Sequence, residues 1–302
     1  MPSDVLEKVP NPITSWEELA RAQDLFRKAE DQDEWVFRGT HDGRPDLRTT
    51  LELVAKEFGV AEDKIPDMEV KLIHEFVRRY HLYSLGPPPR RGDTLEWLTL
   101  MRHYGAPCRF LDFTFSFIIA AFFSLEREGS TQPVVWAINK SWLTRKVAEA
   151  IGTLGEPVGR QFDLYRVHRD GHAFRKLFLE APLPPLVSAV GSYRMNERLT
   201  IQQGLFLCPT DVRTPFMVNL HSMPDHERNI GEIKIAAKTR PDLLAGLHRA
   251  NLNRATLFPG LDGFAASLWT RVASLKRLKS MEDADTEARS KINLDIRALA
   301  RW

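Results

Sequence analysis

The chain has 302 residues, a formal net charge of +2 and 43% hydrophobic residues. This composition is typical of a globular protein with a sizeable core, and the small net charge gives no global argument for a nucleic-acid-binding protein. Cys108 and Cys208 stand too far apart to predict a disulfide framework or a zinc knuckle. The longest apolar run, residues 115–123, is too short to span a bilayer, and the N-terminus lacks signal-peptide features. We therefore expect a cytoplasmic protein that does not associate with a membrane.

The first half of the chain predicts four helices and three strands. Helices are expected at residues 15–29, 67–83, 94–104 and 117–126, with Ser15, Asp93 or Thr94, and Ser116 as N-caps. Strands are expected at residues 35–37, which lead into Arg38 and Gly39, and at 108–114 and 133–139.

The second half alternates less regularly. We expect a helix at residues 141–151, irregular structure at 152–185, strands at 186–190, 199–207 and 231–236, and helices at 241–250 and 263–278. Strands and helices are mixed without regular βαβ alternation, which predicts an α+β fold with a mixed or antiparallel central sheet flanked by helices. The predicted organisation is a helical lead-in (1–34), an α+β domain (35–278) and a charged, weakly helical tail (279–302).

Between residues 101 and 124, polar residues stand next to the most apolar segment of the chain. This arrangement indicates either a buried polar network or a functional site. If residues 108–114 form a strand, Asp112 and Thr114 share one face and Arg109 lies on the other. We therefore expect Asp112 and Thr114 to lie near Arg38. His103 and Tyr104 form either a stacking surface or an ordinary helix end.

Arg38 follows three apolar residues at the point where a strand leaves the sheet. Its guanidinium group matches phosphate oxygens in a bidentate manner, and Gly39 permits the close approach of a ligand or of backbone. The alternative is a buried arginine that pairs with a carboxylate such as Asp112.

Two segments resemble the FRG-domain family of bacterial proteins, which is named after a Phe/Tyr-Arg-Gly tripeptide. The tripeptide is Phe37-Arg38-Gly39, and the second block is HYGAPCRFLDFT at residues 103–114, in which Cys108 and Phe113 replace a threonine and a tryptophan. Weaker likeness at 198–207 and 256–263 extends the match over residues 35–268. Most of the family has no assigned function.

The position of Arg38 is also similar to the first motif of ADP-ribosyltransferases, in which an arginine on the first strand holds a phosphate of NAD. This similarity implies an ADP-ribosyltransferase-like fold with NAD as cofactor and without a metal. Residues implied in cofactor binding are Arg38, Gly39, His103, Tyr104, Asp112, Thr114, Ser116 and Gln202. Gly204 stands where the third motif carries its glutamate, so Gln203 or Glu197 is the implied catalytic residue.

Two functional hypotheses follow from different classes of protein. One is an NAD-consuming enzyme, an ADP-ribosyltransferase or NAD glycohydrolase, that acts as a toxin or phage-defence effector on a nucleic-acid or protein acceptor. The other is a non-catalytic module that binds a nucleotide, a nucleic acid or a protein. A cluster of basic residues indicates either a nucleic-acid-facing patch or a solvated face: Arg78, Arg79, Arg90, Arg91 and Arg102. A third alternative is that Arg38, Arg109 and Asp112 form only a buried network.

Overall fold

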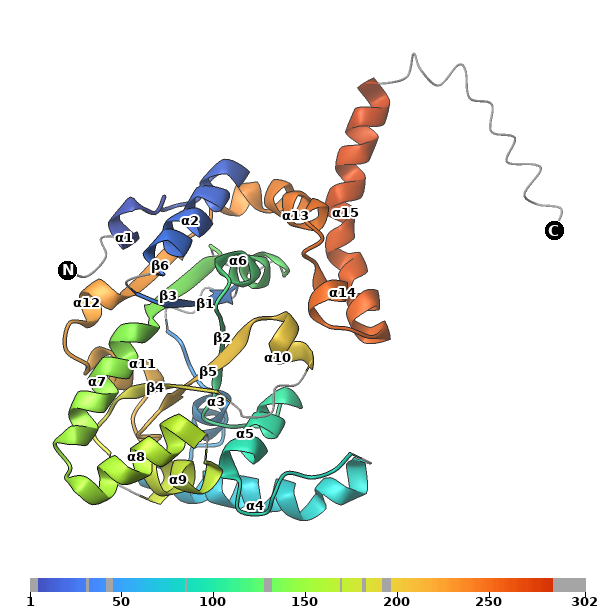
Figure 1. Ribbon diagram of the computed structural model, residues 1–302. Coiled ribbons are helices and arrows are strands. Elements are labelled where there is room, and N and C mark those ends of the chain that lie inside the picture. Colours follow the sequence, from blue (N-terminus) through green and yellow to red (C-terminus); the bar gives the residue numbers. More distant parts are fainter. Residues whose placement is uncertain are drawn as a thin grey trace.

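The computed structural model describes residues 5–30, 33–41, 46–84, 86–127, 132–168, 170–180, 183–191 and 197–284. These residues form an α+β fold around one six-stranded sheet, which confirms the fold class predicted from the sequence (Figure 1). In the described part of the chain, no helix combines the length and the apolar character needed to cross a bilayer.

All neighbouring strands of the sheet are antiparallel, in the order β4-β5-β2-β1-β3-β6. The strands are β1 (Trp35–Thr40), β2 (Leu111–Thr114), β3 (Val134–Asn139), β4 (Val187–Val190), β5 (Gly204–Pro209) and β6 (Ile230–Lys234). Strand β1 is paired with β3 along its whole length, but it shares with β2 only the pair of Phe37 and Thr114. Beyond this pair the ladder between β1 and β2 does not continue, and a pocket opens there.

Helices cover both faces of β1 and β3. Trp35 and Phe37 are buried in one hydrophobic cluster, whereas Val36 between them belongs to another, as expected for the alternation of a strand. The first cluster contains residues of α1 (Val5–Lys8), α2 (Trp16–Ala29), α6 (Phe117–Leu125) and α13 (Arg240–Arg249). The N-terminal segment takes part in the fold, because Ile13 forms a β-bridge with Ile235.

The second cluster is larger and lies on the opposite side of β1. Its helices are α4 (Ile65–Tyr83), α5 (Thr94–His103), α7 (Lys140–Gly152), α8 (Glu156–His168), α9 (Gly171–Arg175), the π-helix η2 (Lys176–Glu180), α10 (Glu197–Ile201) and α11 (Phe216–His221). The remaining elements are α3 (Thr50–Glu57), η1 (Glu62–Lys64), α12 (His226–Asn229), η3 (Ala237–Thr239), α14 (Arg254–Leu257) and α15 (Leu261–Ala284). Helices α13, α14 and α15 contact one another at one end of the molecule (Figure 1).

Three helix starts agree with the expected capping residues. The side chains of Ser15, Asp93 and Ser116 each accept a hydrogen bond from a backbone N–H of the first turn, which confirms the predicted N-caps.

Other parts of the expected secondary structure were wrong. Residues 152–185 contain α8, α9 and η2, because Phe162 and Tyr165 bury one face of an otherwise charged helix. The expected strand at 199–207 is divided into α10 and β5, and Gln203 between them has a φ of 48°. The expected strand at 108–114 is also shorter, since β2 begins only at Leu111.

Two further differences lie at the ends of predicted elements. Helix α3 was not expected, although Thr49 and Glu52 form a capping box at its start. Helix α15 continues past Leu278 to Ala284, and the rest of the predicted weakly helical tail, residues 285–302, lies outside the described residues.

Candidate functional site

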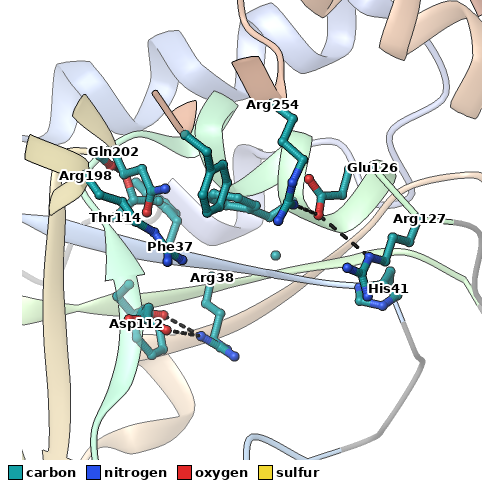
Figure 2. Close-up of a pocket in the computed structure, with 14 residues that line it drawn as sticks. Phe37, Arg38, His41, Asp112, Thr114, Glu126, Arg127, Arg198, Gln202 and Arg254 are labelled. Carbon is teal, nitrogen blue, oxygen red and sulfur yellow. Dashed lines mark hydrogen bonds and ion pairs between the residues drawn. The ribbon is translucent and has the colours of Figure 1, made fainter. Parts of the chain in front are cut away.

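A pocket of about 250 Å³ opens where β1 and β2 diverge, and we call it the arginine pocket (Figure 2). Strands β1 and β2, the C-terminal end of α6, α10 and α14 contribute its walls. Its charged residues are four arginines and two carboxylates: Arg38, Arg127, Arg198, Arg254, Asp112 and Glu126. The arginines outnumber the carboxylates, so the walls favour an anionic ligand.

One end of the pocket is built around Asp112. Arg38 donates a hydrogen bond from Nη1 to the backbone carbonyl of Asp112 at 2.7 Å, and the same nitrogen lies 3.9 Å from Oδ2 (Figure 2). The tighter partner of the carboxylate is Arg102, whose Nε and Nη2 both donate to Oδ2. The side chain of Arg38 remains 25% exposed, so it is held in place without being sealed from solvent.

The electrostatic balance keeps Asp112 ionised. Burial alone would raise the pKa of its carboxyl group, but Arg102, and then Arg38 and Arg198, outweigh this effect and hold the pKa below its usual range. The negative charge therefore stays in place at neutral pH and orients the two arginines that bind it.

The other end of the pocket is built around Glu126, the residue that follows α6. Arg254 donates to Oε1 at 2.5 Å, and Nε of Arg127 lies 3.9 Å from the same oxygen (Figure 2). Only 12% of the Glu126 side chain is exposed. The buried Oε2 atom has no hydrogen-bond partner among the described residues.

Arg198, on α10, lies between the two ends of the pocket and forms no ion pair with a carboxylate of the described residues. In the described part of the chain no acidic side chain lies within 4.0 Å of its guanidinium group, which lies over the Phe258 ring at 4.3 Å. Burial lowers the pKa of Arg198; the charges of Asp112 and Glu126 offset part of this effect, and those of Arg102 and Arg254 add to it, so the pKa stays below its usual range. A bound anion would stabilise a positive charge that the folded protein disfavours in this way.

The structure brings five of the residues predicted for the site into the arginine pocket: Arg38, Gly39, Asp112, Thr114 and Gln202. The hydroxyl group of Thr114 donates to the backbone carbonyl of Gln202 at 2.7 Å, which joins β2 to the end of α10. Gly39 is explained by packing, because a Cβ atom there would lie 2.0 Å from the Ala120 carbonyl oxygen of α6.

His103 lies next to the arginine pocket. It lines a small adjoining cavity with Asp112 and Arg198, which also line the pocket. Burial lowers the pKa of His103, and the charge of Arg198 lowers it further, so the imidazole is neutral at pH 7.

Four of the predicted residues lie elsewhere. Tyr104 is 64% exposed and lines a different cavity. Ser116 caps α6, while Gln203 and Glu197 are exposed and do not line the pocket. Gln203 ends the turn after α10. Its backbone N–H donates to the Thr200 carbonyl, and its side chain is exposed.

Four charged residues of the pocket were not predicted: Glu126, Arg127, Arg198 and Arg254. Glu126 follows an apolar helix and resembles an ordinary helix end, and Arg254 opens a short helix far along the chain. Residues 198–207 resemble the family, but the motif comparison in this segment points to Gln202 and Gln203 and not to Arg198. No local pattern signals that these segments converge.

Comparison with known families agrees with the sequence resemblance. Residues 33–132 match the family model of the FRG domain, and the chain therefore carries an FRG domain in this segment. Searches among curated proteins and among solved structures found no significant match. The matched segment contains Arg38, Asp112 and Glu126, whereas Arg198 and Arg254 lie beyond it.

Proposed function

We propose that the arginine pocket binds a nucleotide through its phosphate groups, and that this nucleotide is NAD. Phosphate oxygens accept charge-assisted hydrogen bonds from arginine, and the pocket has four arginines on its walls. The choice of NAD comes from the sequence resemblance around Arg38, and the charge of the pocket supports the phosphate-bearing class.

The observation that carries the proposal is Arg198. A half-buried arginine without a carboxylate, with its pKa lowered, is costly unless an anion completes its surroundings. The distribution of charge also suits a diphosphate, because Arg38 lies at one end of the pocket and Arg254 at the other (Figure 2). Phe123 and Phe258 supply apolar surface for the rest of the ligand, with ring centroids 6.1 Å apart.

Isothermal titration calorimetry of the Arg198→Met variant tests this proposal. Loss of one charge-assisted hydrogen bond predicts a roughly 10- to 150-fold weaker affinity for NAD and ADP. The melting temperature of the ligand-free variant should stay equal or rise, because the folded protein disfavours the charge of Arg198. Arg145→Met is the matched control, since Arg145 is 57% exposed on α7 and should leave the affinity unchanged. The proposal is wrong if neither NAD nor ADP binds, or if Arg198→Met binds them as the parent protein does.

A second candidate function, NAD consumption, is favoured by Glu126. This residue brings to the pocket the carboxylate that the Gln202-Gln203-Gly204 segment lacks. In such a reaction the bond between the ribose C1′ and nicotinamide breaks, nicotinamide leaves with the bonding electrons, and water or an acceptor adds to C1′ and gives up its proton. A nearby carboxylate would stabilise the positive charge at C1′, and the reaction would take place in the cytoplasm, as expected from the sequence.

Chromatographic detection of nicotinamide separates this candidate from simple binding. The parent protein should release nicotinamide from NAD in the presence of bacterial lysate, and Glu126→Gln should reduce the rate at least 100-fold while NAD still binds. If NAD binds but nicotinamide release stays at the background level, the domain is a nucleotide-binding module.

A further inference from the structure

A second cavity, of about 470 Å³, lies between the C-terminal half of α4 and the end of α5. We call it the aromatic groove, after the side chains that line it: Phe76, Tyr80, Tyr83, Met101, Tyr104 and Pro107. It shares no lining residue with the arginine pocket.

The rings of the groove form a fixed floor with two open edges. Tyr80 packs against Phe76 and Trp97 with ring centroids 6.2 and 5.4 Å away, and its hydroxyl group accepts a hydrogen bond from Ser84. Tyr83 and Tyr104, in contrast, are 83% and 64% exposed. These two rings are not buried in the core, so their faces can stack against a planar group of a ligand.

The charge around the groove is positive. Arg90 and Arg91 lie in the segment that joins α4 to α5; both are exposed, and neither has a carboxylate within 4.0 Å among the described residues. The Trp97 indole donates a hydrogen bond to the Arg90 carbonyl at 3.0 Å, which holds this segment beside the floor of the groove. The carboxylate of Glu75, on the groove wall, is neutralised by Arg79 at 2.5 Å.

The groove is joined to the arginine pocket by two neighbouring rings. Tyr104 packs edge-on against His103 with centroids 4.9 Å apart, and His103 lines the small cavity that contains Asp112 and Arg198. Arg102, which the sequence grouped with the basic cluster, binds Asp112 instead and takes no part in the groove.

We infer that the aromatic groove binds single-stranded nucleic acid, with unpaired bases stacked on Tyr83 and Tyr104 and phosphates bound by Arg90 and Arg91. Exposed rings with neighbouring arginines are the combination that binds single strands irrespective of sequence. A duplex would not fit this surface, because its base faces are covered. This site is distinct from the proposed nucleotide site and does not depend on it.

Fluorescence anisotropy with labelled strands of about 12 nucleotides tests the inference. DNA and RNA strands of one sequence should both bind, and the duplex should bind at least tenfold more weakly. Two arginine–phosphate contacts predict a slope of about −1.4 in a plot of log K against log salt concentration. Arg90→Gln with Arg91→Gln should bring this slope close to zero, because both contacts are lost.

The aromatic rings are tested by the double variant Tyr83→Ala with Tyr104→Ala, which should bind single strands at least tenfold more weakly. Phe58→Ala and Trp269→Ala are matched controls, because these exposed rings, at 73% and 86%, lie outside the groove and should leave binding unchanged. Arg198→Met should also leave it unchanged, which keeps this site separate from the nucleotide pocket.

Three results would overturn the inference. One is the absence of binding at about 50 mM salt, where phosphate contacts are strongest. Another is equal binding of single strands by the Tyr83→Ala, Tyr104→Ala variant and the parent protein. The third is capture of a protein by the parent chain but not by this variant, without oligonucleotide binding, which would make the groove a protein-docking surface.

Discussion

Phe37, Arg38 and Gly39 are consecutive on β1 and make three different kinds of contact. The Phe37 ring packs in the core against Phe26 and Phe117, with centroids 4.7 and 5.4 Å away. Arg38 binds Asp112 at the rim of the arginine pocket, and Gly39 lies against the backbone of α6. The tripeptide thus connects the core, the pocket and the sheet–helix contact within one short segment.

Replacement of Gly39 by alanine should destabilise the protein. The new Cβ atom would lie 2.0 Å from the Ala120 carbonyl oxygen and 2.5 Å from the Ser124 nitrogen, so α6 would have to move. Such overpacking costs about 1–3 kcal/mol of unfolding free energy, measurable by urea denaturation. Gly92→Ala is the control, because a Cβ atom at Gly92 would meet no neighbouring atom within 4 Å. Equal stability of both variants would contradict this explanation of the glycine.

Residue-scale features were predictable where they depend on neighbours in sequence. Ser15 and Ser116 were identified as caps because an N-cap bonds to its own first turn. Strand alternation placed Asp112 near Arg38, and the two residues are in contact. Arg198 and Glu126 could not be assigned to the pocket, since their approach depends on how α10 and α6 pack on the sheet.

At the scale of elements, one buried arginine connects four segments. Arg109, just before β2, binds the carboxylate of Glu69 on α4 through Nε and Nη2. Its Nη1 donates to the carbonyl of Phe178 in η2 at 2.8 Å, and it lies 3.4 Å from the carbonyl of Pro209 on β5. This guanidinium group therefore satisfies polar groups at a point where strand pairing has not yet begun.

Glu69→Gln should destabilise the protein by about 3–5 kcal/mol, because it leaves the charge of Arg109 buried without a counter-ion. The double variant Glu69→Leu with Arg109→Met should recover much of this loss, since no buried charge remains. Urea denaturation measures both effects. Glu75→Gln, on the exposed side of α4, is the control and should change the unfolding free energy by less than about 1 kcal/mol. A loss below about 1 kcal/mol in Glu69→Gln would show that the pair is dispensable.

Elements were predictable where apolar periodicity was strong, as in α4, or where a capping residue precedes a continuous apolar run, as in α6. The segment at 152–185 was missed because α8 buries few side chains, and its many charges resemble those of a loop. Residues 199–207 have the apolar spacing of a strand, but hydrogen bonds from Gln202 to Arg198 and from Gln203 to Thr200 close a helical turn first.

At the scale of the whole molecule, the sheet joins segments that are distant in the chain. The fold class followed from the irregular mixture of strands and helices, but the order β4-β5-β2-β1-β3-β6 did not, because strand pairing depends on contacts between distant segments. The family-model match at 33–132 contains β1 and β2, whereas their fully paired neighbours β3 and β5 lie beyond it.

A fragment of residues 33–132 should therefore not fold on its own. It would keep a single residue pair, Phe37 with Thr114, between its two strands, and it would lack β3 and β5, with which β1 and β2 are fully paired. Circular dichroism should show no cooperative thermal transition for this fragment, in contrast to a fragment of residues 5–284. A cooperative transition in the short fragment would mean that residues 33–132 fold independently, without the other four strands of the sheet.

The central position of β1 also has a consequence during synthesis. Strand β6 ends at Lys234, about 100 residues after the family-matched segment, so at typical translation rates the sheet would stay incomplete for about 5–20 s after this segment is made. During this interval the edges of β2 and β3 that later pair with β5 and β6 would be open to chaperones or to neighbouring nascent chains. The segment that matches the family is thus synthesised well before the sheet that contains it is complete.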